Sequence, residues 1–182
     1  MSTITETPTL AVELVPSPVW GSNLRTLAPK AWPRLRQLTR ERSDGCAYCD
    51  GPAAQCHEGW AYDEHDERFG TQRLTALLMV CEDCHRVVHL GRTGKVEGAK
   101  GISKAKAHLA AVNGWTADEV ERHVADAQST WTRRSAMGWG LDLTAAEGYG
   151  LTRDDLDDLP FVVDATVRHE VTGAGLPAAM AR

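Results

Sequence analysis

The chain has 182 residues, of which 42% are hydrophobic and 25% are charged, and its formal net charge at pH 7 is −5. This length allows one hydrophobic core with a small appendage and excludes two large domains. No apolar run reaches the ~18 residues of a membrane span, and the N-terminus lacks the basic and apolar regions of a signal peptide, so we expect a soluble, cytoplasmic protein without a membrane partner.

Basic residues are concentrated in two segments, although the chain as a whole is acidic. Residues 19–43 carry six basic residues and one acid, and residues 85–108 carry the same numbers. Acidic residues gather between these segments and in a C-terminal extension, residues 141–182. This distribution suits a polyanion, so we expect DNA as the partner, with RNA as an alternative. The candidate phosphate contacts are Arg34, Arg36, Arg40, Arg42, Arg86, Arg92, Lys95 and Lys100.

The first 42 residues contain one expected helix. Residues 1–18 are rich in Thr and Pro and predict a flexible arm, either extended or disordered. The helix is expected over residues 31–42, with Pro33 in its first turn and Leu35 and Leu38 facing inward. Its exposed arginines contact phosphates or form a merely solvated basic face, and the helix taken alone favours neither interpretation.

Four of the five cysteines form two Cys-x2-Cys pairs separated by 31 residues. These pairs are Cys46 with Cys49 and Cys81 with Cys84. Their spacing predicts one structural zinc ion held by four thiolates, and the alternative is a set of buried or unpaired cysteines. Cysteines in metal-type pairs indicate a protein of a reducing compartment rather than one stabilised by disulfide bonds. The fifth cysteine, Cys56, belongs to neither pair.

Between the pairs we expect two short strands, and after them a helix. Residues 53–60 and 74–80 have strand character, and the acidic segment 61–72 between them is expected to be a solvated loop. The helix begins at the second cysteine pair. His85 and His89 are four residues apart on it, so they share a face and converge on one ion, whereas a lone helical histidine is usually structural. Across the hairpin lie Cys56 and His57, and because adjacent strand residues point to opposite faces, we expect only one of them to look into the site.

Beyond the helix, residues 91–101 predict a glycine-rich basic loop that contacts phosphate or serves as a linker. A short helix over residues 103–112 ends at an Asn-Gly pair. A Thr-x-x-Glu capping box then opens a long amphipathic helix within residues 115–140. Its apolar stripe, expected to be core, consists of Val120, Val124, Ala127 and Trp131.

The acidic extension has weaker signals. Thr152 and Asp155 predict a brief capped helix, and residues 161–171 have enough Val for a strand. The aspartates at 154, 155, 157 and 158 form a solvated acidic turn, or else occupy the basic surface in place of phosphate.

Two stretches of the chain resemble a known family. The sequences QCHEGWAYDE and LLMVCEDCHRVVHLGR are similar to a phage and bacterial subgroup of the HNH endonucleases, which have a ββα-metal fold. The upstream sequence VWGSNLRTLAPKAWPRLR is also similar, so the resemblance covers roughly residues 19–140. It implies an α+β protein whose HNH-like core, residues 19–114, is stapled by the four-cysteine zinc and framed by helices.

The resemblance also implies roles for individual residues. His57 is expected to be the general base, Cys56 occupies a position that holds a metal ligand in the family, and His85 and His89 are the helix ligands of a second divalent ion. Candidates for that ion are Zn²⁺, Mn²⁺, Ni²⁺ and Mg²⁺, and a cysteine ligand favours the softer Zn²⁺ over Mg²⁺. The family also has an asparagine a few residues before the second cysteine pair that steadies the base. It is missing here, and counting five residues back from Cys81 gives Ala76 in its place.

These features lead to three functional expectations. The first is an HNH-type, metal-dependent endonuclease that hydrolyses DNA phosphodiester bonds, with a base taking a proton from water while an ion steadies the charged phosphorane and leaving group. The second is a non-catalytic, zinc-containing nucleic-acid binder with a degenerate site. The third is a structural or toxin-like partner module regulated by its acidic tail. The three histidines favour the first, and the missing asparagine favours the second.

Overall fold

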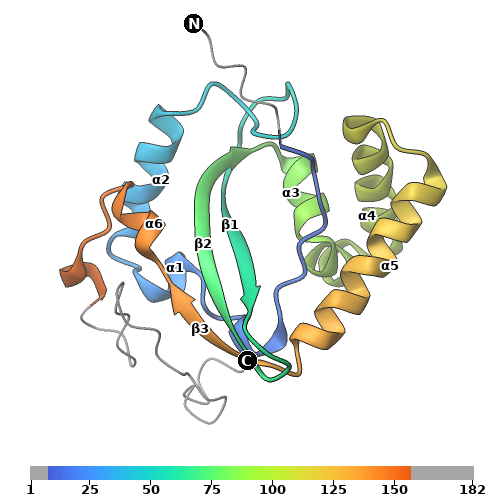
Figure 1. The fold of residues 1–182 in the computed structure, drawn as a ribbon. Helices are drawn as coiled ribbons and strands as arrows, with labels where there is room; N and C mark the ends of the chain where they lie inside the picture. Colours follow the sequence, from blue (N-terminus) through green and yellow to red (C-terminus); the bar gives the residue numbers. More distant parts are fainter. Residues whose placement is uncertain (1–7, 157–182) are drawn as a thin grey trace, which may run out of the picture. The chain divides into compact units, whose positions relative to one another are not determined.

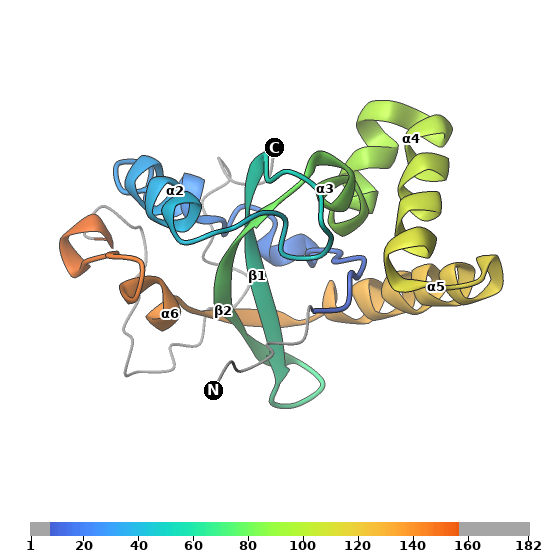
Figure 2. The same ribbon diagram turned by 90° about the horizontal axis from the view of Figure 1, so that it is seen from above.

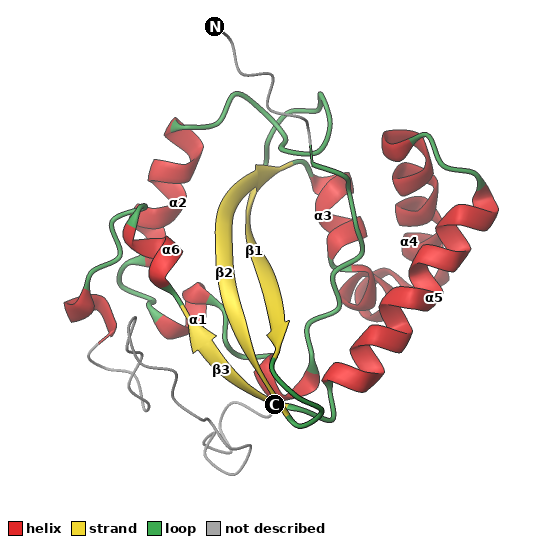
Figure 3. Ribbon diagram, viewed as in Figure 1, coloured by secondary structure: helices red, strands yellow, loops and turns green. Residues whose placement is uncertain are grey.

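The computed structural model describes residues 8–156 and shows a mixed α+β chain with a small three-stranded sheet (Figures 1 and 3). The strand order is β1-β2-β3, and β2 pairs in parallel with β3 from Phe69 opposite Gly138 to Arg73 opposite Asp142. The elements in chain order are η1 (Ser17–Val19), α1 (Leu24–Leu27), α2 (Trp32–Glu41), β1 (Gln55–Glu64), β2 (Phe69–Val80), α3 (Glu82–Val88), α4 (Leu90–Asn113), α5 (Ala117–Arg134), β3 (Gly138–Asp142), α6 (Thr144–Glu147) and η2 (Arg153–Leu156).

The described residues divide into two compact units. The first contains the described residues up to Leu14, Ser43–His57 and Leu78–Trp131. The second contains Val15–Arg42, Glu58–Leu77 and the described residues from Thr132 onward. Strands β1 and β2 therefore contribute residues to both units. Among the described helices, none is long and apolar enough to cross a membrane.

The hydrophobic core of the first unit contains residues of α3, α4 and α5. These helices lie beside one another in two views (Figures 1 and 2). Val87 and Val88 of α3 and Leu109 of α4 are almost fully buried there. Val120 of α5 is also buried, and further residues of its predicted apolar stripe pack against this core. The amphipathic pattern therefore identifies the inward face of α5 correctly.

An N-terminal segment, residues 8–14, also belongs to this core. Leu10 is fully buried, and its backbone N–H and carbonyl both bond to the side-chain amide of Asn113, at 3.2 and 2.8 Å. The Val12 N–H donates to Nε2 of His123 at 3.0 Å. The sequence predicts a flexible arm over residues 1–18 and not this packing, because a few apolar residues in an irregular segment produce no periodic signal.

The helix boundaries near the caps agree with the sequence. Helix α2 begins and ends within one residue of its predicted range. Gly114 ends α4 in the left-handed conformation, with φ of 68°. The backbone N–H of Thr116 donates to the Glu119 carboxylate at 2.7 Å, and the Glu119 N–H donates back to the Thr116 hydroxyl at 3.3 Å. These are the reciprocal bonds of the predicted capping box.

The prediction of a solvated loop over residues 61–72 is wrong. The strands extend into it, and only residues 65–68 remain between them. Within the second unit, β3 pairs with the start of β2, and the Tyr62 ring packs edge-on against Trp139 with centroids 5.2 Å apart. Asp63 pairs with Arg73 on the neighbouring strand at 2.9 Å. Pairing of β1 with β2, and of β2 with β3, outweighs the low strand propensity of the acidic residues here.

The prediction of a glycine-rich loop over residues 91–101 is also wrong, because α4 runs through it. The helix is interrupted only at Gly98, which has φ of 65° and ψ of −157°. A Cβ on Gly101 would lie 2.4 Å from Glu97 Cβ and 3.1 Å from Thr93 Cγ2, so glycine permits close packing at this point. Glycine weakens a helix by about 1 kcal/mol relative to alanine, and tertiary packing outweighs that cost.

Near the end of the described chain, a short 3-10 helix, η2, replaces the brief helix that Thr152 and Asp155 predict. The Thr152 N–H donates to the Asp155 carboxylate at 2.8 Å, which is one of the two bonds of a capping box. The strand predicted over residues 161–171 lies outside the described residues, as do the aspartates at 157 and 158.

Candidate metal centres

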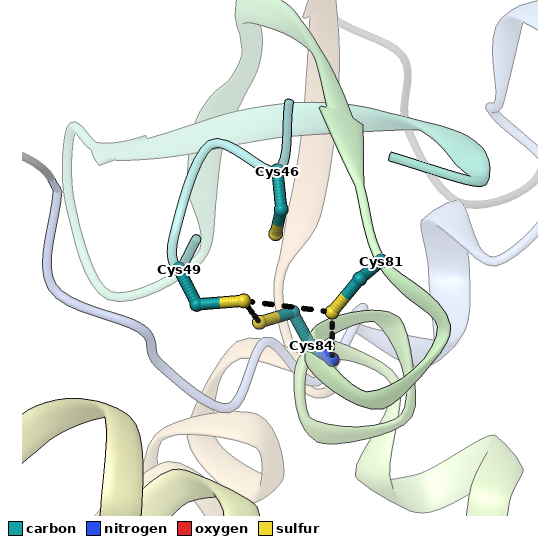
Figure 4. A group of neighbouring side chains, drawn as sticks. All are labelled: Cys46, Cys49, Cys81 and Cys84. Carbon is teal, nitrogen blue, oxygen red and sulfur yellow. Dashed lines mark hydrogen bonds between the residues drawn. The ribbon is translucent and has the colours of Figure 1, made fainter. Parts of the chain in front are cut away.

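Four cysteines of the first unit bring their sulfur atoms together (Figure 4). The four Sγ atoms lie within 4.8 Å of one another. Cys49 Sγ is 3.7 Å from Cys81 Sγ and 3.6 Å from Cys84 Sγ. A zinc ion with Zn–S bonds of about 2.3 Å in a tetrahedron requires sulfur atoms about 3.8 Å apart. The spacing between sulfurs therefore fits one tetrahedral metal ion, and the predicted four-cysteine cluster, with Cys46 as its fourth member, is present.

Local backbone structure aims these sulfurs at one point. Cys81 caps the N-terminus of α3, where its Sγ accepts the Cys84 N–H at 3.3 Å. The Gly51 N–H donates to Cys49 Sγ at 3.4 Å, and the Cys46 N–H donates to the Gly51 carbonyl at 3.1 Å. A Cβ on Gly51 would lie 3.3 Å from Cys49 Sγ. The first cysteine pair therefore folds around a glycine that leaves room for the sulfur.

The thiols do not all ionise readily by themselves. Burial raises the pKa of the Cys84 thiol well above its ordinary value, and the neighbouring cysteines raise it further. Burial also raises the pKa of Cys49. At Cys46 burial opposes ionisation, but backbone hydrogen bonds at Cys81 and Tyr48 outweigh it and lower the pKa. Four clustered thiolates need a compensating cation, and a divalent ion supplies that charge.

His108 of α4 also contacts this cluster. Its Nε2 is 3.2 Å from Cys84 Sγ, within hydrogen-bond range for sulfur. When the cysteine is a thiolate, the imidazole N–H can donate to it and reduce its negative charge. No motif in the sequence points to His108, because it follows Cys84 by 24 residues and belongs to no ligand-spacing pattern.

A second cluster in the same unit consists of three histidines. His57 comes from β1, His85 from α3, and His89 directly follows the last residue of α3. Their nearest ring nitrogens lie within 4.8 Å of one another. The ring centroid of His57 is 5.9 Å from that of His85 and 5.1 Å from that of His89. The structure therefore brings the two helix histidines together, as their spacing predicts, and adds His57 to them.

The environment keeps the two helix histidines neutral at pH 7. Burial lowers the pKa of His85 to about 4, with further contributions from His57 and Arg92. Burial lowers the pKa of His89 to about 3, again with nearby positive charge contributing. Neutral imidazoles have a free lone pair, which is the form that binds a metal. His85 and His89 can therefore both ligate one ion, and the other coordination positions of that ion stay open.

These lowered values predict a pH dependence for protein that holds zinc only at the cysteines. The unfolded chain binds protons at His85 and His89 below about pH 6.5, whereas the folded chain does not until about pH 4 and about pH 3. The free energy of unfolding should therefore be greatest above pH 6.5 and fall by about 2–3 kcal/mol between pH 7.5 and 5.5.

Urea unfolding at several pH values measures this slope. The control is a variant with glutamine at both positions, His85→Gln and His89→Gln, which retains the cysteine cluster and should lose most of the slope. An equal slope in the variant and the parent protein would show that other groups cause it.

Cys56 belongs to neither cluster of ligand atoms among the described residues, although it adjoins His57 in β1. Neighbouring residues on a strand point to opposite faces, so only one of the two was expected to reach the site. The histidine is the residue that does.

The eight candidate phosphate contacts fall in both units. Those of α2 lie in the second unit, where Arg34 pairs with Asp155 at 2.9 Å while Arg36 and Arg40 are exposed. In the first unit, Arg86 is held by three acids, at 2.7 Å from Asp83, 3.0 Å from Glu97 and 3.6 Å from Glu82. The remaining candidates in this unit, all exposed, are Arg92, Lys95 and Lys100.

Both centres use residue types typical of metal ligands. Comparison of the chain with protein-family models, with curated proteins and with solved structures finds no match in any of the three. The chemistry of the four-cysteine cluster and of the three-histidine cluster is therefore inferred from their residues and geometry.

Proposed function

We propose that the protein is a metal-dependent endonuclease of the HNH type, which hydrolyses phosphodiester bonds in DNA. The observation that carries the proposal is the convergence of His57, His85 and His89 from a hairpin and the helix that follows it. The order β1, β2, α3 is that of a ββα-metal core, and the four-cysteine cluster lies at the start of the same helix.

Each histidine has a role in this proposal. His85 and His89 hold a divalent ion, for which their neutral state suits them. When bound, such an ion stabilises the charge of the phosphorane and the leaving oxygen. His57 accepts a proton from the attacking water, which a positioned imidazole does effectively near neutral pH. The cysteine-bound zinc holds the helix and the strand ends in place.

A non-catalytic nucleic-acid binder is the second candidate. Two observations favour it: Ala76 stands where the resembling family has an asparagine, and His57 is close enough to the helix histidines to serve as a third ligand. A histidine whose lone pair is bound to the ion cannot accept a proton from water. The protein would then hold two ions and bind DNA without cleaving it.

The deciding experiment combines a metal count with a nicking assay. Two ions per chain support a second centre besides the cysteine cluster, and one ion supports the cluster alone. Supercoiled plasmid is then incubated with the protein across Zn²⁺, Mn²⁺, Ni²⁺ and Mg²⁺, with a chelator control. Nicking that needs the metal and is lost in His85→Ala and His89→Ala supports the endonuclease. Tight binding without nicking in any metal supports the second candidate.

Binding to DNA should weaken steeply as the salt concentration rises, because phosphate contacts release condensed counterions. Asp155 pairs with Arg34, which also donates to the Gly150 carbonyl at 2.6 Å, so this arginine is engaged within its own unit. We expect Asp155→Asn to strengthen non-specific binding and to make the slope of log K against log salt steeper by about 1.

Fluorescence anisotropy over a salt series measures both effects. Asp154→Asn is the matched control, because it removes the same charge from the neighbouring residue, whose side chain is exposed. The same strengthening in both variants would indicate a general charge effect rather than the release of Arg34. Affinity independent of salt would argue against a nucleic-acid partner and favour the partner-module alternative.

A further inference from the structure

The carboxylate of Glu13 lies beside the buried imidazole of His57. Glu13 Oε2 is 3.3 Å from His57 Nε2, and the two side chains are 31% and 2% exposed. No group in the described part of the chain makes a hydrogen bond of ordinary geometry to this nitrogen. Buried ring nitrogens in folded proteins almost always have a partner, and a carboxylate is a strong acceptor for an imidazole N–H.

The backbone around Glu13 is held in place by the rest of the first unit. The Glu13 N–H donates to the Val88 carbonyl at 2.9 Å, directly before His89 in the chain. The preceding residue, Val12, is buried and donates its N–H to His123 of α5. Glu13 is therefore placed by backbone bonds to α3 and α5, and its carboxylate does not depend on a long flexible segment for its position.

The geometry favours an action of Glu13 on His57 rather than on the ion. Among the described residues, the cluster of mutually close ligand atoms contains the three histidines and does not include the Glu13 carboxylate. A histidine at a metal or catalytic site commonly donates its second ring N–H to a carboxylate, which fixes the ring orientation and the tautomer. Glu13 is the carboxylate that contacts His57.

We propose that Glu13 is a positioning residue, whose carboxylate accepts the Nε2–H of His57 and so holds the imidazole in one tautomer, with the lone pair on Nδ1. This inference rests on the proposed function, in which that lone pair takes a proton from water. It also assigns a group to the orienting task that Ala76 cannot perform. The orienting group comes from the N-terminal segment, 44 positions before His57.

The direct test is the tautomer of His57, which long-range ¹H–¹⁵N correlation spectra report for each imidazole. His57→Ala identifies its signals among those of the seven histidines. In the parent protein we expect a protonated Nε2 and an unprotonated Nδ1. Glu13→Ala should give a mixture of tautomers, and Glu13→Gln should keep the single tautomer because its amide oxygen still accepts the N–H.

Nicking rates supply the second readout. Removing a carboxylate that orients such a histidine typically costs 10- to 100-fold in activity. We expect a loss of that size in Glu13→Ala, in kcat rather than in KM. Glu13→Gln should recover part of the lost rate. Glu121→Ala is the control in the same unit, because its carboxylate pairs with Lys106 at 2.7 Å. It should change neither the tautomer nor the rate.

The outcomes separate this inference from the endonuclease proposal. An unchanged His57 tautomer in Glu13→Ala would overturn the role of Glu13 even if the parent protein nicks DNA. A mixed tautomer in that variant, with no nicking by the parent protein in any metal, would support the positioning role and overturn the endonuclease. If Glu13→Ala fails to fold, the parent protein decides the matter. A His57 imidazole protonated at Nδ1 and not at Nε2 would overturn the inference.

Discussion

Replacing Cys84 with serine is expected to unfold the first unit. Cys84 is fully buried and its sulfur lies 3.6 Å from that of Cys49, so serine removes one ligand at the centre of the cluster. Structural zinc contributes roughly 10–16 kcal/mol of apparent binding free energy in small domains, whereas a whole domain is stable by only about 5–15 kcal/mol. The binding free energy lost with most of the zinc affinity is therefore larger than the free energy of unfolding that would remain, so the unit should unfold. Elemental analysis and thermal unfolding followed by circular dichroism measure the effect.

Cys56→Ser is the matched control. Cys56 is half-buried in β1 and lies outside the four-sulfur cluster, so the same substitution there should leave the zinc content unchanged and the melting temperature within a few degrees. If Cys84→Ser kept its zinc and its melting temperature, the cluster would not be the structural staple. If both variants unfolded alike, the loss would reflect replacement of a buried thiol rather than of a ligand.

Replacing His57 with alanine is expected to abolish most DNA cleavage without unfolding the protein. Truncation of a positioned general base typically costs ~10² to 10⁴ in rate. Zinc at the four cysteines and affinity for DNA should remain close to those of the parent, because His57 contributes to neither in the proposed mechanism. Plasmid nicking, zinc content and the melting temperature are measured on the same preparations. The control is His65→Ala, since His65 is exposed in the hairpin and bonds to the Thr71 hydroxyl at 2.8 Å.

Affinity for the second ion distinguishes the two roles open to His57. Retained affinity in His57→Ala, together with lost cleavage, fits a base. Affinity lost to the same degree as in His85→Ala and His89→Ala fits a third ligand and supports the non-catalytic candidate. Equal nicking by the parent and by His57→Ala would mean that another group, or a contaminating nuclease, removes the proton.

The sequence predicted those parts of the site that depend on short spacings. Cysteines three residues apart and histidines four residues apart point the same way through local geometry, so the four-cysteine cluster and the approach of His85 to His89 follow from the chain itself. Likewise, the capping box at Thr116 depends on neighbouring residues only. Strand positions also predicted that one of Cys56 and His57 would face the histidines, though not which one.

Features that depend on distant packing were missed. Glu13 and His108 reach the two clusters from segments far away in the sequence, and no periodicity or motif connects them with their partners. The full length of β2 depends on β3, whose pairing begins 69 residues after Phe69. Glycine propensity argued against a helix after His89, whereas close packing at Gly101 makes a small residue necessary there. In each case tertiary contacts outweigh the local preference.

Helix α3 contributes candidate ligands to both clusters, so two bound ions would be thermodynamically dependent on each other. The helix has seven residues and is about 10 Å long. Cys81 caps its start, Cys84 and His85 are neighbours near its middle, and His89 follows its last residue. If each cluster held an ion, the first to bind would bear the entropic cost of ordering the helix, so the second would bind more tightly, and by reciprocity the enhancement would be equal in both directions. Loss of the ion at the cysteines would then lower metal occupancy at the histidines.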